Sequence, residues 1–155
     1  MATTIQLYNH TVNRFNEGLN GESDTYKVML LNNTAVFAAA HTTLLEVAGA
    51  ETGGPGTARV NEVSGNGWTI GGETLTSVST ATFSTNGGQF DAADISKAIT
   101  GGSLGPIYKF VLFNATDANL PPVLFGTLSS AMTVPDGSSA GIVWPANGII
   151  TWSVV

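Results

Sequence analysis

The side chains that could do chemistry in this chain are few and scattered. His10 and His41 are its two imidazoles. A catalytic triad would need one of them to meet a serine and an aspartate in the folded chain. Because such a site is defined by geometry and not by the presence of residue types, we interpret both histidines as surface residues. The sequence predicts no catalytic residue.

Two short stretches match binding motifs only in part. The segment Asp91-Ala-Ala-Asp94 could supply half of a cation site, but no Asp-x-Asp-x-Asp loop with a following Glu provides the six to eight oxygens that a hard cation takes. The segment Gly53-Gly54-Pro55-Gly56-Thr57 lacks the Gly-Lys-Ser/Thr end of a phosphate-binding loop. We interpret the first as a solvated turn and the second as a flexible loop. We therefore expect no metal, no cofactor and no small-molecule substrate.

Composition limits the possible partners. The 155 residues include five Lys plus Arg against eleven Asp plus Glu, which gives a net charge of -6, and no Cys. The basic residues are widely separated in sequence, whereas nucleic-acid binding relies on clustered Lys and Arg. No apolar run reaches the roughly 20 residues of a membrane span, and the start lacks the features of a secretory signal. We expect a soluble protein that binds neither nucleic acid nor membrane.

The elements that would position these residues begin with an amphipathic helix. Apolar residues near the N-terminus recur at steps of three and four, which predicts a helix over about residues 4–18. Thr3 and Gln6 have the spacing of a capping box at its start. The stripe consists of Ile5, Tyr8, Val12, Phe15 and Leu19.

Beyond the helix the apolar pattern changes to that of strands. Residues 107–114 are almost continuously apolar and predict a central strand, which we expect to pair with residues 123–128. Strands are also predicted over residues 25–32 and 73–85, together with a terminal hairpin formed by residues 141–144 and 149–155. Residues 42–50 predict a short helix. Because helices do not alternate with strands, we expect a mainly β protein, a single domain over residues 1–155 forming a jelly-roll-like antiparallel β-sandwich.

Residues 52–67 form a long Gly-rich stretch between these elements. Glycine supplies unusual backbone angles, and a loop of this length is usually functional or mobile. Trp68 at its end could be either an interface anchor or a core residue, and both alternatives remain open. Trp152 lies on an alternating strand and is predicted to be a core residue.

The order and spacing of these segments are similar to those of the decoration, or cement, proteins of tailed bacteriophages, which clamp the outside of the capsid. The resemblance runs over most of the chain. It is carried by Gly18-Leu-Asn-Gly21 after the helix, Asp24-Thr-Tyr-Lys-Val-Met-Leu-Leu31, Gly67-Trp-Thr-Ile-Gly-Gly-Glu-Thr-Leu75, Phe90-Asp-Ala-Ala-Asp94, Ile107-Tyr-Lys-Phe-Val-Leu-Phe-Asn114 and the closing Trp144-Pro-Ala-Asn-Gly-Ile-Ile150.

The resemblance implies a non-enzymatic virion protein. It would be made in the host cytoplasm, bind the major capsid protein on the capsid exterior, stabilise the head and self-associate as a dimer or trimer. The alternatives are another virion component, such as a tail, fibre or receptor-binding β module, and, less favoured, a small hydrolase. We expect the N-terminal segment and the Gly-rich loop to contact the capsid or a neighbouring subunit. The candidate contact residues are Tyr8, Phe15, Gly53, Gly54, Pro55, Arg59 and Trp68.

Overall fold

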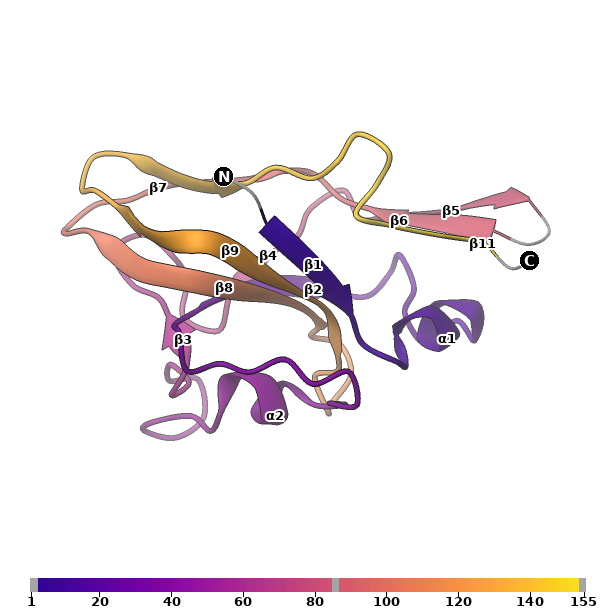
Figure 1. Cartoon of the computed structure of the whole chain (residues 1–155), viewed down its shortest axis with the longest axis horizontal. Coiled ribbons are helices and arrows are strands. Elements are labelled where there is room, and N and C mark those ends of the chain that lie inside the picture. The colour runs from indigo at the N-terminus through magenta and orange to yellow at the C-terminus, as the bar shows by residue number, and fades with distance from the viewer. Residues whose placement is uncertain (1–2, 85–86, 154–155) are drawn as a thin grey trace.

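The computed structural model describes residues 3–84 and 87–153, and its main element is a six-stranded antiparallel sheet (Figure 1). The sheet has the order β1 (Thr3–Leu7), β9 (Pro122–Val134), β8 (Leu104–Asn114), β2 (Tyr26–Leu31) and β3 (Glu62–Val63), with β4 (Glu73–Thr74) also paired to β2. Two smaller antiparallel sheets consist of β10 (Ser139–Ile142) with β7 (Ile95–Ala98), and of β11 (Ile150–Ser153), β6 (Gly87–Asp91) and β5 (Ser79–Ser84). The helices are α1 (Thr11–Asn16) and α2 (Leu44–Ala48).

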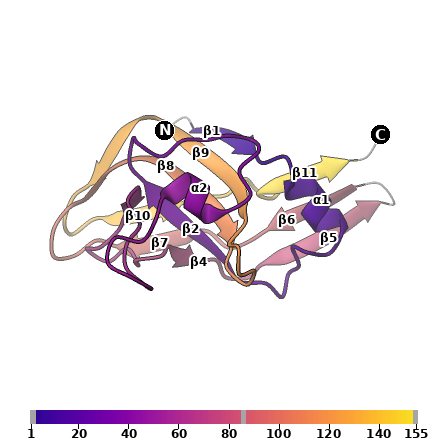
Figure 2. The ribbon, with the colours of Figure 1, turned by 90° about the horizontal axis from the view of Figure 1, so that it is seen from below.

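The centre of the large sheet is buried on both faces because its side chains alternate between two hydrophobic clusters. One, the inter-sheet cluster, combines Val28, Leu30, Phe110 and Leu112 with residues of the smaller sheets. The other, the α2 cluster, combines Met29, Leu31, Val111 and Phe113 with one face of α2. Figure 2 shows α2 lying against β2 and β8, on the side away from the smaller sheets in Figure 1. Successive residues of a strand point to opposite faces, so near-continuous apolar runs are what this arrangement requires.

Several elements confirm the sequence predictions. The strands predicted at residues 25–32 and 107–114 are β2 and β8, and β9 pairs with β8 along Leu112 and Leu124. The short helix predicted at residues 42–50 is α2. It begins with a capping box between Thr43 and Glu46, in which the Glu46 carboxylate accepts the Thr43 backbone N–H at 2.9 Å.

The helix predicted over residues 4–18 is wrong in its first half. Residues Thr3–Leu7 form β1, which pairs with β9, and only Thr11–Asn16 are α-helical. The capping box expected between Thr3 and Gln6 does not form because both residues belong to the strand. The helical spacing of Tyr8 and Phe15 has another origin: Tyr8 enters the α2 cluster and Phe15 enters the inter-sheet cluster.

The predicted terminal hairpin is also wrong. Strand β10 pairs with β7 and β11 pairs with β6, so the two segments bind different partners instead of each other.

The strand predicted over residues 73–85 is divided into β4 and β5, and Ser77 between them has a positive φ of 53°. Thr85 of that prediction, and Val154 and Val155 of the hairpin prediction, lie outside the described residues.

Candidate functional site

Three of the predicted contact residues are core residues. Tyr8 and Trp68 are 2% exposed and Phe15 is 9% exposed. The Phe15 ring lies 5.1 Å from that of Phe90 and 5.2 Å from that of Trp152, and this contact joins α1 to the β5–β6–β11 sheet. A capsid contact through these three side chains would require the fold to open. The structure therefore corrects their assignment, and for Trp68 it favours the core alternative. Trp152 packs partly buried against the same cluster, as predicted.

The Gly-rich loop does present an exposed surface. Gly53, Gly54 and Pro55 are all exposed at its turn. The turn is closed by hydrogen bonds from the Thr52 N–H to the Ala58 carbonyl (3.0 Å) and from the Gly53 N–H to the Thr57 hydroxyl (2.9 Å). The loop is thus held by its own polar groups, and backbone and small side chains form its outer surface.

Arg59 has an internal role at the base of this loop. Its guanidinium donates to the Gly49 carbonyl at 2.9 Å and lies 3.9 Å from the Glu51 carboxylate. Glu51 and Arg59 also form an isolated β-bridge across the loop. The side chain is mostly buried and fixes the loop to the end of α2, so a partner would meet the turn before it meets the Arg59 charge.

A second exposed surface was missed by the sequence analysis. Strand β1 is the edge of the large sheet and is exposed along its whole length, with Ile5 47% and Leu7 39% exposed. Its outer edge has no strand partner within residues 3–84 and 87–153. Val143, 79% exposed, lines the same cavity as Ile5. We call Ile5, Leu7 and Val143 the β1 edge surface. The β-branched run Thr3-Thr4-Ile5 was the signal that could have indicated a strand here.

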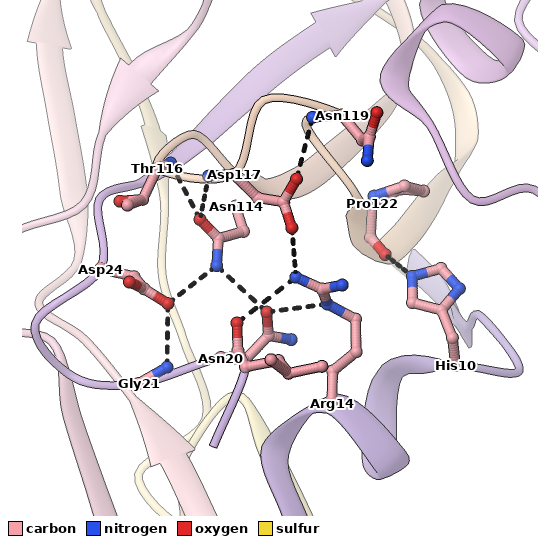
Figure 3. A network of polar contacts seen from close by, with 11 residues as sticks. His10, Arg14, Asn20, Gly21, Asp24, Asn114, Thr116, Asp117, Asn119 and Pro122 are labelled. Carbon is pink, nitrogen blue, oxygen red and sulfur yellow. Dashed lines mark hydrogen bonds and ion pairs between the residues drawn. The ribbon is translucent and has the colours of Figure 1, made fainter. Parts of the chain in front are cut away.

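A network of polar contacts holds α1 and the turn after it on the connection between β8 and β9 (Figure 3). The Arg14 guanidinium forms an ion pair with Asp117 at 2.8 Å and also contacts Asn20. A hydrogen bond from the Asn119 N–H, together with Arg14, lowers the pKa of the Asp117 carboxyl. The polar groups of this network therefore bind one another and fix α1 against the β8–β9 connection.

His10 is part of the same network of polar contacts (Figure 3). It was expected at the surface but is partly buried, and its Nε2 lies 2.9 Å from the Pro122 carbonyl. Burial lowers the pKa of His10, which favours the neutral ring whose Nε2–H donates to that carbonyl. The next residue, Thr11, donates its hydroxyl to the Val123 carbonyl at 2.7 Å. Both contacts attach the start of α1 to β9.

The acidic stretch at residues 91–94 is also engaged in local structure. The Asp94 carboxylate accepts the Trp144 backbone N–H at 2.8 Å, and the Asp91 carboxylate accepts the Ala92 N–H at 2.9 Å. Over the part of the chain that the structure describes, no group of three or more His, Cys, Asp or Glu could hold a metal ion. No helix among these residues is long and apolar enough to cross a membrane.

Comparison with known proteins gives no relative. No protein-family model matches the chain, and no curated protein or solved structure is significantly similar to it. The resemblance to phage decoration proteins therefore rests on the sequence segments alone, and the exposed surfaces described above are the structural basis for a functional proposal.

Proposed function

We propose that this protein is a non-enzymatic structural protein of a phage virion that binds the major capsid protein on the outside of the head and stabilises the capsid. The observation that carries the proposal is the β1 edge surface. Apolar side chains on the open edge of a sheet can bury area and pair backbone groups with a partner. The exposed turn of Gly53, Gly54 and Pro55 is the second contact in the proposal.

Binding alone explains how such a protein would act. A ligand that binds the assembled shell and not its separated subunits stabilises the shell by mass action. The contact is repeated at every symmetry-equivalent point of a capsid. Self-association as a dimer or trimer, which is part of the proposal, would link neighbouring sites and make the later contacts effectively intramolecular. Modest individual interfaces would then be sufficient.

The finer architecture belongs to the same proposal. The inter-sheet cluster lies between the large sheet and the two smaller ones, which supports the β-sandwich expected from the sequence. The jelly-roll-like topology remains a prediction, because the covering strands pair as a two-stranded and a three-stranded sheet.

The experiment that tests the function is co-sedimentation of the purified protein with undecorated heads and, separately, with tails. We expect it to sediment with heads and to raise the temperature at which those heads open. Sedimentation with tails alone would support a different virion component, and sedimentation with neither would contradict a virion role. Analytical ultracentrifugation of the free protein tests the dimer or trimer.

A further inference from the structure

The two edges of the large sheet differ in their protection against further strands. Strands β3 and β4, which both pair with β2, have two residues each. At the other edge, β1 pairs with β9 over all five of its residues without a bulge, from Thr3 with Leu128 to Leu7 with Leu124. Proteins usually protect a sheet edge by shortening it or by placing a bulge, a charge or a proline there. The sequence of β1, Thr-Thr-Ile-Gln-Leu, has none of these features, so its outer edge is open to an additional strand.

An apolar cavity of about 490 Å³ lies beside this edge, between the large sheet and the segment that follows β10 (Figure 1). Ile5 and Val143 both line the cavity and are exposed, which places its opening at the molecular surface. Thr3 also lines it, so the cavity lies on the side of β1 to which Thr3 and Ile5 point. Alternate side chains of a strand added beside β1 would point to the same side. A bulky side chain of that strand could therefore enter the cavity.

The segments that form this surface are uncharged. Residues 3–9 and 137–153 contain no Asp, Glu, Lys or Arg, although the chain has a net charge of -6. None of the residues that line the cavity is charged. A charged side chain placed here would lose its hydration without gaining an opposite charge. The surface therefore selects an uncharged segment.

A second copy of this chain fits the edge poorly. It would bring its own β1, whose Thr3 and Ile5 already line the cavity of their own chain and are not free to fill that of a neighbour. Two chains with a net charge of -6 each would also repel one another. The occupant that fits is a different chain, with a bulkier apolar side chain that is free to enter the cavity.

We propose that β1 accepts, as an additional strand, an extended uncharged segment of a partner protein that has bulky apolar residues at alternate positions, one of which enters the cavity. Backbone pairing with the edge supplies affinity, and the cavity selects the side chain. A helix could not pair in this way, because its own backbone groups are already bonded to one another. The identity of the partner as the major capsid protein rests on the function proposed above.

The first test uses the full chain and a peptide of the proposed chemistry. The probe is Thr-Leu-Thr-Phe-Thr-Leu-Thr, followed by a Gly-Ser-Gly-Lys tail for solubility, and calorimetric titration measures its binding. We expect a dissociation constant of about 100 μM or lower. Replacing its Phe by Ala should weaken binding at least about fivefold, because the cavity loses its occupant. No binding at about 1 mM, or equal binding of the two peptides, would overturn the proposal.

Methylation of the peptide backbone tests the strand pairing. Alternate residues of a strand direct their N–H groups to the same neighbour. One peptide therefore carries N-methyl groups on two of its apolar residues, and a second carries them on two of its Thr residues. We expect one of them to bind as the parent peptide does and the other to bind at least about tenfold more weakly, since it loses two hydrogen bonds. Equal affinities would show that no strand is added.

Hydrogen exchange locates the added strand. We expect the parent peptide to slow exchange at alternate backbone amides of Thr3–Leu7, which are those that face away from β9, and to leave the exposed amide of Gly54 unchanged. Exchange that is unchanged throughout β1 would contradict the site. Analytical ultracentrifugation of the free protein provides a control. A dimer in which these amides are already protected would assign the edge to a second copy and overturn the proposal.

Two variants test the cavity. Val143→Lys places a charge at its opening, and Val36→Lys places the same charge at an exposed position that does not line it. Because both side chains are exposed, we expect both variants to fold as the wild type does. The first should bind the parent peptide at least about tenfold more weakly, and the second should change its affinity less than about twofold. Equal losses would refute the role of the cavity.

Undecorated heads separate this inference from the proposed function. We expect heads to slow exchange at the same β1 amides and the parent peptide to compete with heads for the protein. Binding of the peptide without binding of heads would support the strand site and contradict the capsid role. Binding of heads without protection of β1 would overturn the strand site and leave the capsid role in place.

Discussion

Asn114, at the end of β8, is buried with the full hydrogen-bonding capacity of its amide in use. Its Nδ2 donates to Asn20 at 3.1 Å and to Asp24 at 2.9 Å. Its Oδ1 accepts the backbone N–H groups of Thr116 at 2.9 Å and Asp117 at 3.4 Å. A side-chain amide has two donor hydrogens and two acceptor lone pairs, so no isosteric residue satisfies the same partners. This single side chain joins the β8–β9 connection to the turn after α1.

Replacing that amide by a carboxylate is expected to destabilise the fold. In Asn114→Asp, an oxygen faces the Asp24 carboxylate and the Asn20 carbonyl, and we expect a loss of about 3 kcal/mol in the free energy of unfolding near neutral pH. The loss should diminish in acid, because a protonated Asp regains a donor. Urea unfolding of this variant and of Asn119→Asp, an exposed control in the same connection, measures both effects. Equal losses in the two variants would contradict the role given to Asn114.

The ion pair between Glu73 and Lys97 makes stability depend on pH. The Glu73 side chain is 5% exposed and lies 2.8 Å from the Lys97 ammonium. Burial by itself would raise the pKa of Glu73, but the Lys97 contact and the hydrogen bonds from Thr69 outweigh it and hold the pKa below its ordinary value. A lowered carboxyl pKa stabilises the folded state above the ordinary pKa, and this contribution is lost as the pH falls through the folded-state pKa.

Two variants of this pair should differ in the pH dependence of their own free energy of unfolding. Glu73→Gln removes the charge, so we expect a loss of about 2 kcal/mol at neutral pH that vanishes as the pH falls from about 5 to about 3. Lys97→Met leaves a buried carboxylate without its partner, so the variant should gain stability relative to the wild type as the pH falls. Urea unfolding over this pH range checks both trends. Parallel profiles for the two variants would show that the ion pair does not set the pKa of Glu73.

At the scale of elements, local patterns predicted the strands that are buried on both faces and failed where partners are distant in sequence. Strands β2 and β8 were predictable because their apolar runs meet a hydrophobic cluster on each face. The pairing of β10 with β7 joins residues 139–142 to residues 95–98, and no local signal specifies such a partner. In the N-terminal segment, two rings that enter different clusters had the spacing of one helical face.

Some of the candidate contact residues could likewise be predicted from local sequence patterns, and others could not. The exposed turn of Gly53, Gly54 and Pro55 was predictable because Gly and Pro punctuate loops. Tyr8, Phe15 and Trp68 were assigned to an interface and are buried, since large rings are favoured in cores and in interfaces for the same physical reason. The β1 edge was not predicted because its residues were assigned to a helix.

The exposed edge of β1 gives a prediction for head binding. Leu7→Lys removes an apolar side chain from the β1 edge surface, and we expect head affinity to fall about tenfold while the circular dichroism spectrum stays unchanged. Gln6→Lys adds the same charge on the opposite face of the strand and should change the affinity less than about threefold. Co-sedimentation titrations measure both. If the two variants weaken binding equally, the apolar face of β1 is not the contact.

The Gly-rich loop can be tested independently of β1. Deleting residues 53–56 removes the exposed turn but keeps Thr52 and Thr57, and its base stays attached through Arg59. We expect the urea midpoint to change little and head affinity to fall about tenfold, as when an interface contact is removed. Val60→Thr, at an exposed position outside the turn, keeps the length of the loop and should bind as the wild type does. Undiminished binding by the deletion variant would exclude the loop as a contact.

At the scale of the whole molecule, most of the positive charge is used internally. Arg14, Arg59 and Lys97 form ion pairs with acidic residues, and the Lys109 ammonium donates to the Asn33 carbonyl at 2.9 Å. The chain has five basic residues in total, so its outer surface has few cations to offer a partner, and the net charge of -6 is carried by acidic groups. Both proposed contact surfaces are made of apolar side chains, glycine and backbone.

Head binding should therefore be nearly insensitive to salt. Raising the ionic strength from about 0.05 M to about 0.5 M shortens the screening length from roughly 14 Å to roughly 4 Å, which weakens contacts between exposed charges. Contacts through Leu7 and the turn at Gly54 involve no charge, so we expect head affinity to change less than about threefold over this range. Co-sedimentation at several salt concentrations, with the Leu7→Lys variant measured alongside, checks this. A fall of about tenfold or more for the wild type would mean that acidic side chains, and not the apolar edge of the sheet, hold the protein on the capsid.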